Sequence, residues 1–160
     1  MTKKAHKSEA KNEESSSNKV LAKLTQIPDK DRLTFYPTYF TIVFPMIEER
    51  LYRTMETLTV GYDGGLWNFY TFRGANNKKI PVTLWDADPD LKLTIESLGL
   101  QETYTTSPIV ASFTLWTMVI NQVLWQTRDA KLHDYWQELT DFAYNTFTDA
   151  DQLIFHNILD

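Results

Sequence analysis

Apolar residues recur every three or four positions in four stretches of the chain, which is the spacing of one face of a helix. The first stretch places Ile47, Leu51, Tyr52, Met55 and Leu58 on such a face, while its charged residues fall mostly on other faces. The predicted helices cover residues 45 to about 59, 108 to about 127, 129 onward and 148 onward.

Helix start signals precede three of these stretches. Pro45 suits a first helical turn, where its missing N–H has no intrahelical partner to lose. Ser107 is a predicted N-cap, followed by Pro108 at the first helical position. Thr148 and Asp151 resemble a capping box, in which two side chains satisfy backbone N–H groups of the first turn. These signals locate the helix starts.

Between the first and second predicted helices, the pattern changes to that of β-strands. Strands are predicted at residues 66–72, 80–85 and 91–96, with turns at 74–77 and 86–90 between them. Because the turns are short, the strands are expected to pair as an antiparallel meander. The sequence thus predicts an α+β protein, in which a small antiparallel sheet of about three strands packs against about four helices.

The N-terminal region differs in composition from the rest. Residues 1–19 are mostly Lys, Glu, Ser and Asn, with almost nothing to bury, so they are predicted to form a disordered tail. Residues 20–160 are predicted to form a single domain. Within it, residues 25–40 combine aromatic residues with turn signals at Pro28 and Pro37, which favours an irregular segment packed on the domain.

The composition supports a folded chain with a large core. Of its 160 residues, 42% are hydrophobic, including 5 Trp, 8 Tyr and 9 Phe. The lack of cysteine excludes a disulfide scaffold, a thiolate zinc site and a cysteine nucleophile, and is consistent with a cytoplasmic location. Residues 103–127 carry no charge, but polar residues interrupt their apolar part, so a buried core helix is predicted there and no membrane contact is expected.

The net charge of −5 is unevenly distributed along the chain. Residues 1–19 carry +2 and the other 141 residues carry −7, so strong binding to nucleic acid is not expected of the domain. A mimic of about 40 Å of DNA would need roughly 20 net negative charges, so strong DNA mimicry is not expected either. The acidic C-terminal third offers a solvated surface or a candidate face for a basic partner, formed by Asp134, Glu138, Asp141, Asp149, Asp151 and Asp160.

No catalytic site, metal site or cofactor is predicted. His133 and His156 lack the accompanying ligands of a known metal-binding spacing. The aspartates within residues 86–90 resemble the start of a calcium loop, but the glycine and the terminal Glu that such a loop needs are missing. The glycines within residues 61–65 follow a helix instead of opening one, which does not fit a phosphate-binding loop. A hydrolase without a recognisable motif is the weakest alternative.

One part of the chain resembles a known protein family. The sequence YDGGLWNFYTF at residues 62–72 follows a helix that contains LYRTM at residues 51–55, and this combination is similar to the ArdB/KlcA antirestriction family. Upstream, Pro28, Arg32 and the FYPTYF segment of residues 35–40 also resemble the family, as does the closing Ile-Leu-Asp. The similarity covers about residues 25–160 and is sharpest over 28–72. The turn GANNKKIP that follows departs from the family pattern.

The resemblance implies a small, cytoplasmic, non-enzymatic α+β protein of plasmids or other mobile elements that lets incoming DNA escape type I restriction. Its partner would be a type I restriction complex or an associated host protein, bound by protein–protein contact, and its oligomeric state stays open. The family signature supplies the candidate interaction residues Tyr62, Asp63, Gly64, Gly65, Trp67, Phe69 and Tyr70.

Two alternatives accompany this interpretation. The signature residues equally suit a structural role, since glycines permit a turn between helix and strand and one strand face must enter the core. The alternative function is a nucleic-acid-binding accessory protein of a mobile element, which would use the Lys-rich tail and exposed aromatic residues to bind single strands.

Overall fold

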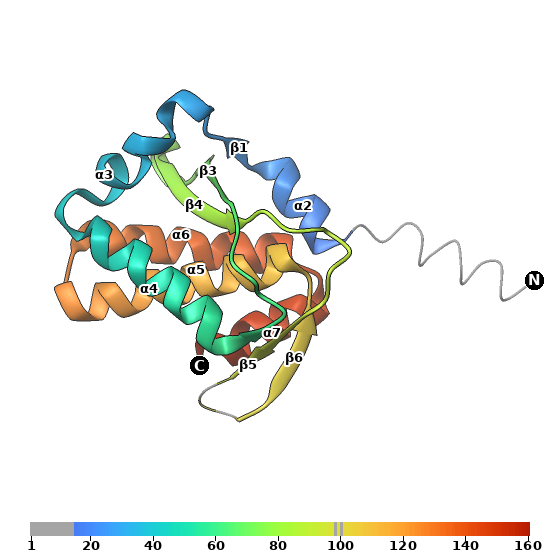
Figure 1. The fold of residues 1–160 in the computed structure, drawn as a ribbon. Helices are drawn as coiled ribbons and strands as arrows, with labels where there is room; N and C mark the ends of the chain where they lie inside the picture. Colours follow the sequence, from blue (N-terminus) through green and yellow to red (C-terminus); the bar gives the residue numbers. More distant parts are fainter. Residues whose placement is uncertain (1–14, 98, 100) are drawn as a thin grey trace, which may run out of the picture.

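A central helix, α5, organises the structure, with helices and two small sheets around it (Figure 1). The computed structural model describes residues 15–97, 99 and 101–160, so the disorder predicted for residues 1–14 concerns a part outside the described residues. The predicted α+β class is confirmed. The elements in chain order are α2 (Ser16–Lys23), β1 (Thr25–Gln26), η1 (Asp29–Thr34), α3 (Phe35–Phe40), η2 (Thr41–Val43), α4 (Phe44–Leu58), β2 (Thr59–Val60), β3 (Trp67–Arg73), η3 (Ala75–Asn77), β4 (Lys79–Trp85), β5 (Leu93–Glu96), β6 (Thr103–Thr106), α5 (Pro108–Thr127), α6 (Ala130–Thr146) and α7 (Asp149–Leu159).

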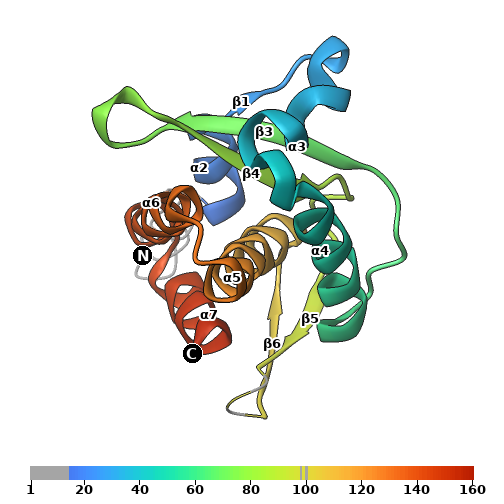
Figure 2. The ribbon, with the colours of Figure 1, turned by 90° about the vertical axis from the view of Figure 1, so that its left-hand side faces the viewer.

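Helix α5 is buried on most of its surface. It carries apolar residues in every turn, and thirteen of its 20 residues are buried. It contacts α4, α6, α7 and β4, and Figure 2 shows it between the helices of the bundle. By length and composition alone α5 could cross a membrane, yet most of its apolar window is covered by the rest of the chain. This agrees with the predicted core helix.

The predicted helix starts are confirmed. The hydroxyls of Ser107 and Thr148 cap α5 and α7, accepting hydrogen bonds from backbone N–H groups of the first turns. Pro45 lies in the first turn of α4. Asp129 is the N-cap of α6, where its Oδ1 accepts a hydrogen bond of 2.8 Å from the N–H of Lys131. The three capping side chains each satisfy a helix N–H that has no partner within its own helix, and Pro45 has no N–H to satisfy.

The first sheet has the strand order β1-β3-β4. Strands β3 and β4 form the predicted hairpin, paired antiparallel from Trp67 opposite Trp85 to Arg73 opposite Lys79. The turn predicted between them is present and contains η3. The two-residue strand β1 pairs only with the middle of β3, so the end of β3 next to the turn extends beyond it.

The predicted meander is wrong, because the third predicted strand does not join the hairpin. Strand β5 lies in a second antiparallel sheet of order β2-β5-β6. A turn in which Asp88 Oδ1 accepts a hydrogen bond of 3.0 Å from the N–H of Asp90 separates β4 from β5. Leu93 and Ile95 of β5 are fully buried, and β5 contacts α5. Burial against the central helix therefore decides where β5 lies.

The predicted tail is also wrong for residues 16–19, which belong to α2. Ser16 is buried, and its hydroxyl donates to Asp151 Oδ2 at 2.5 Å and accepts from the N–H of Thr148 at 2.9 Å. These contacts join α2 to the first turn of α7. This polar segment buries little apolar surface, mainly that of Val20. It is ordered because its hydrogen bonds to the N-terminus of α7 add to that stabilisation.

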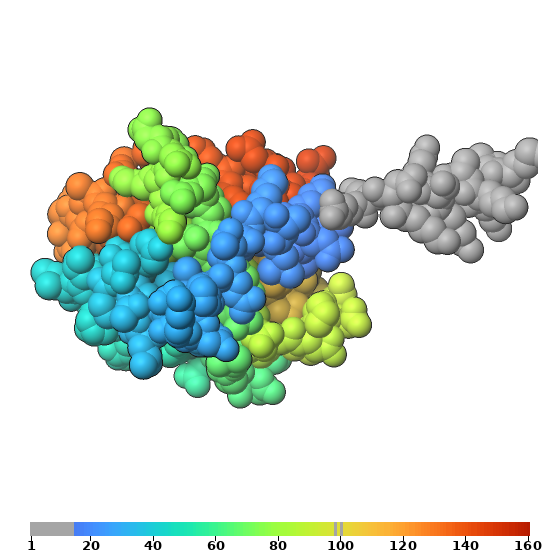
Figure 3. All heavy atoms as spheres, turned by 90° about the horizontal axis from the view of Figure 1, so that it is seen from above, coloured from blue at the N-terminus to red at the C-terminus, as the bar shows by residue number. Residues whose placement is uncertain are grey.

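Residues 25–43 pack across one face of the domain as a series of short elements (Figure 3). Phe35 stacks on Phe69 of β3 with ring centroids 4.6 Å apart and planes 4° from parallel. Phe40 packs edge-to-face on Trp116 of α5 at 5.6 Å. The predicted packing on the domain is confirmed, although the segment is more helical than an irregular segment would be.

Replacing Ser16 by Ala should lower the free energy of unfolding by about 1–3 kcal/mol, because the N–H of Thr148 loses its side-chain acceptor and Asp151 Oδ2 keeps only the hydroxyl of Thr148 as a donor. Urea denaturation followed by circular dichroism measures this. Asn18→Ala on the exposed side of α2 is the control, and it should change the stability by less than about 0.5 kcal/mol. Wild-type stability of Ser16→Ala would contradict the role given to this contact.

Candidate functional site

The signature begins in the loop between β2 and β3, residues 61–66, which we call the glycine loop. Gly64 and Gly65 have φ values of 83° and 107°, which residues with a side chain adopt only with strain. A Cβ added at Gly64 would meet no atom within 4 Å, and one at Gly65 would lie 3.8 Å from the indole nitrogen of Trp85. The requirement for glycine here is therefore conformational and not steric.

Aromatic residues fix the glycine loop to the hairpin. Tyr62 packs edge-to-face on Trp85 with ring centroids 4.9 Å apart, and its hydroxyl accepts a hydrogen bond of 3.1 Å from the indole N–H of Trp67. The indole N–H of Trp85 donates to the carbonyl of Gly64 at 2.9 Å. Because Trp67 and Trp85 are direct cross-strand neighbours, the loop is bound to both strands.

Arg32 connects the N-terminal segment to the start of β3. Its Nη2 donates to the carbonyl of Trp67 at 2.7 Å and its Nη1 to Asn68 Oδ1 at 3.5 Å. Its guanidinium carbon lies 4.8 Å from the ring centroid of Phe69, in cation–π geometry. This residue of the family resemblance thus contributes to packing between η1 and the hairpin.

The structure divides the signature into two groups. Trp67 and Phe69 are buried and contribute to the core. Asp63 is exposed, and within the described part of the chain its carboxylate has no hydrogen bond or ion pair. Tyr70 is half-buried, and the pKa of its hydroxyl is raised, mainly by desolvation. The side chain of Asn68 opposes this shift without cancelling it. Tyr62 is half-buried too, but its hydroxyl and ring are already engaged by Trp67 and Trp85. Asp63 and Tyr70 are therefore the signature side chains with most freedom to contact a partner.

Two residues of the predicted acidic face bind the tip of the hairpin. Asp134 forms an ion pair of 3.0 Å with Lys78. Glu138 Oε1 accepts a hydrogen bond of 3.0 Å from the N–H of Ala75, and a Cβ at Gly74 would lie 2.6 Å from its carboxylate. Both carboxylates thus connect α6 to β3 and β4.

The other predicted acidic residues lie on different parts of α6 and α7. Asp149 and Asp151 occupy the first turn of α7, where negative charge is favourable, and Asp151 also binds Ser16. Asp160 at the end of the chain pairs with His156 at 3.0 Å. Among the described residues, only Asp141 and Asp149 of the six candidates have no side-chain hydrogen bond or ion pair. The acidic candidates therefore serve mainly the fold and do not form one free face.

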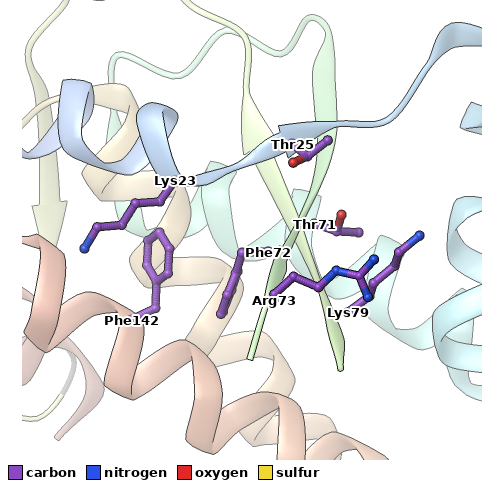
Figure 4. Close-up of a pocket in the computed structure, with 7 residues that line it drawn as sticks. All are labelled: Lys23, Thr25, Thr71, Phe72, Arg73, Lys79 and Phe142. Carbon is purple, nitrogen blue, oxygen red and sulfur yellow. The ribbon is translucent and has the colours of Figure 1, made fainter. Parts of the chain in front are cut away.

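A cationic pocket of about 520 Å³ opens beside β1 (Figure 4). Arg73 and Lys79 form its charged part, and their direct cross-strand pairing places like charges opposite each other, which is unfavourable in a sheet. The ammonium of Lys23 points away and donates to Thr146 Oγ1 at 2.9 Å. The pocket could hold a single anionic group. It is lined by Lys23, Thr25, Thr71, Phe72, Arg73, Lys79 and Phe142.

Sequence reasoning missed this pocket because its lining comes from α2, β1, β3, β4 and α6. The one sequence signal for the cationic pocket was the pair of cations, Arg73 and Lys79, on either side of the 74–77 turn. Among the aspartates of residues 86–90, Asp88 caps its own turn. Of the histidines, His156 pairs with Asp160. Within the described ranges, no group of three or more His, Asp or Glu side chains is placed to hold a metal ion.

Comparison with known proteins identifies a shared fold. A solved structure superposes on this chain with a TM-score of 0.62 and 21% sequence identity, covering 84% of this chain and 94% of that chain. That work describes KlcA and ArdB as proteins with a novel fold and antirestriction activity against type I DNA restriction systems in vivo but not in vitro. The resemblance read from residues 28–72 is confirmed as a similarity of fold.

Sequence comparison finds two relatives in Escherichia coli (strain K12). The uncharacterized protein YafX is 36% identical over 50 residues, which are 30% of this chain and 33% of YafX. The uncharacterized protein YfjX is 32% identical over 71 residues, which are 43% of this chain and 44% of YfjX. The matched stretches thus span less than half of each relative. No family model matches the chain.

Gly65→Ala should lower the free energy of unfolding by about 1–3 kcal/mol, because the φ of 107° is strained for any residue with a Cβ. Urea denaturation measures the loss. Gly99→Ala is the matched control, since its added Cβ would make an ordinary contact of 3.5 Å and its φ is not in the left-handed region. An equal loss in both variants would contradict a conformational role for the glycine loop.

Proposed function

We propose that this chain is a non-enzymatic antirestriction protein of a mobile genetic element, which alleviates type I restriction of incoming DNA through contact with another protein. The observation that carries the proposal is the fold shared with KlcA and ArdB over 84% of the chain. Because fold alone does not establish function, the signature contacts of the glycine loop add a second, residue-level argument. In this chain Tyr62 is bound to Trp67 and Gly64 to Trp85, so residues that carry the family resemblance hold the loop on the hairpin.

Charge argues for protein contact over DNA mimicry. The −7 of residues 20–160 is well below the roughly 20 charges that a mimic of about 40 Å of DNA would need. Asp134 and Asp160 are also paired with Lys78 and His156, which reduces the free acidic surface further. A short-range contact with a protein surface needs no such charge density.

The described in vivo activity of KlcA and ArdB, absent in vitro, supports an indirect route for this chain. We infer that it acts in the cytoplasm on a restriction complex together with, or by way of, a host protein. Asp63 and Tyr70 would take part in the contact, because Asp63 is exposed and Tyr70 half-buried, whereas the hydroxyl of the half-buried Tyr62 is already bound by Trp67.

The cationic pocket favours one second candidate, an accessory protein that binds single-stranded nucleic acid. Arg73 and Lys79 could hold one phosphate, and the Lys-rich N-terminus would add charge. A gel-shift series compares the full chain, a chain without residues 1–14 and Arg73→Ala. Binding that weakens steeply with salt and is lost in these variants would favour this candidate; its absence would leave the antirestriction proposal.

Expression of the chain in a host with a type I restriction system should raise the plating of unmodified phage by at least an order of magnitude, without changing plating on a host that lacks the system. Purified protein should leave cleavage by the purified restriction enzyme unchanged. Asp63→Ala should reduce the in vivo effect at unchanged thermal stability, whereas the equally exposed Asp29→Ala should not. Unchanged plating across several type I systems would overturn the proposal.

A further inference from the structure

A groove opens where α5 turns into α6, at the end of the molecule that faces the viewer in Figure 2. It has a volume of about 420 Å³, and we call it the tryptophan groove. It shares no residue with the glycine loop, the acidic candidates or the cationic pocket. Its lining residues are Asn121, Leu124, Trp125, Arg128, His133 and Trp136.

Trp125 is the unusual residue of this groove. It is 65% exposed, although α5 is largely buried. An indole left in water contributes little to the stability of the fold, whereas tryptophan is enriched among the residues that dominate protein interfaces. The half-buried Trp136 adds a second indole from α6. The groove thus offers apolar surface that the domain itself does not cover.

Arg128 places a cation on this apolar surface. It ends α5 in the left-handed conformation, with φ of 60°, a position that favours glycine. Its guanidinium carbon lies 5.2 Å from the ring centroid of Trp125, and within the described residues its side chain has no carboxylate or carbonyl partner. Glycine is favoured at this backbone position, and within the described residues the N–H donors of Arg128 are free. These two observations point to a role of the side chain other than stability.

The neighbouring turn between α3 and α4 lies at the same end of the molecule (Figures 1 and 2). Ile42 in this turn is 90% exposed, and Thr41 has φ of 50°, which is strained for a β-branched residue. The hydroxyl of Tyr135 on α6 donates to the carbonyl of Tyr39 in α3 at 3.2 Å and connects these two helices. This end of the molecule therefore carries a strained residue and an exposed apolar residue in addition to the groove.

We propose that the tryptophan groove binds a short segment of a partner protein in which an apolar or aromatic side chain lies next to Asp or Glu. Leu124, Trp125 and Trp136 provide the surface for the apolar side chain. The guanidinium of Arg128 donates to the carboxylate, for which its planar pair of N–H groups is suited.

The charges around the groove select this occupant. Arg50 of α4 lies near the same end of α5, where its Nη2 donates to Gln126 Oε1 at 2.9 Å, so a second arginine lies close to the groove although it does not line it. The nearby carboxylate of Asp129 is already used to cap α6. One or two carboxylates fit this arrangement, whereas a nucleic acid strand would bring a phosphate at every nucleotide toward a domain of net −7.

This binding does not depend on antirestriction activity. The segment could belong to a restriction subunit, a host protein or another partner, and the peptide experiment below contains none of them. A failed plating test would therefore leave the groove proposal intact, and failed peptide binding would leave the antirestriction proposal intact.

The test uses the full chain and two fluorescein-labelled hexapeptides, Glu-Asp-Leu-Trp-Glu-Asp and its basic counterpart Lys-Lys-Leu-Trp-Lys-Lys. Fluorescence anisotropy measures affinity, and the indole N–H signals of Trp125 and Trp136 in ¹⁵N NMR spectra of the labelled protein report the location. The acidic peptide should bind at sub-millimolar concentration and shift both signals, and the basic peptide should bind at least about tenfold more weakly.

Two variants separate binding from folding. Trp125→Ala should weaken binding of the acidic peptide at least about tenfold at unchanged thermal stability, because its side chain is mostly in water. Arg128→Gly should also weaken binding but raise Tm by about 2–4 °C, because glycine relieves the left-handed strain. Leu153→Ala, which removes another exposed apolar side chain, is the control and should bind as the wild type does.

Four results of the binding experiments would overturn the proposal, and a fifth result concerns the oligomeric state. These are the absence of acidic-peptide binding, equal binding of the basic peptide, wild-type affinity of Trp125→Ala, and tighter binding of oligo(dT) at the same indole signals. Concentration-dependent dimerisation that Trp125→Ala abolishes would also overturn it, by assigning the groove to a second copy of the chain.

Discussion

The burial of α5 is the constraint on which the rest of the structure depends. Residues 111–120 are buried without interruption, so this helix needs cover on every side. Its buried polar residues need no hydrogen bond from water, because the hydroxyls of Ser112, Thr114 and Thr117 each donate to the carbonyl four residues earlier. The indole N–H of Trp116 donates to the carbonyl of Pro81 in β4. The first sheet is thereby joined to α5 by both packing and a hydrogen bond.

This constraint explains which parts of the fold the sequence could predict. Helix starts were predictable because caps such as Ser107 and Thr148 act within three or four residues. The β3–β4 hairpin was predictable because its turn is local. The division into two sheets was not, because it is decided by the burial of Leu93 and Ile95 against the bundle. Strand β6 carries the polar sequence TYTT, which gives no apolar alternation.

The site was predicted only in part, for a related reason. The signature was recognisable because its residues are contiguous in the sequence. Its spacing could not show that Tyr62 binds Trp67 and that Gly64 accepts a hydrogen bond from Trp85 of the next strand, contacts that already engage these residues within the fold. The acidic face was inferred from charge counts along the chain. Such counts do not show that Lys78 forms an ion pair with Asp134. The cationic pocket draws residues from distant segments and left almost no local signal. The tryptophan groove comes from residues 121–136 alone, but its exposure depends on how α5 and α6 pack.

Surface charge limits how such a protein can act. A long-range electrostatic partner, whether DNA or a DNA-binding cleft, requires charge of one sign over a broad area. Here carboxylates are paired with Lys78 and His156, while Arg73, Lys79 and Arg128 interrupt the negative surface. We therefore expect recognition by this chain to rest on short-range contacts, in which burial of an exposed apolar group such as Trp125 would supply the free energy and one charge pair would fix the orientation. Because most signature residues serve stability, recognition would fall to Asp63 and Tyr70 at the edge of the signature and to the tryptophan groove outside it.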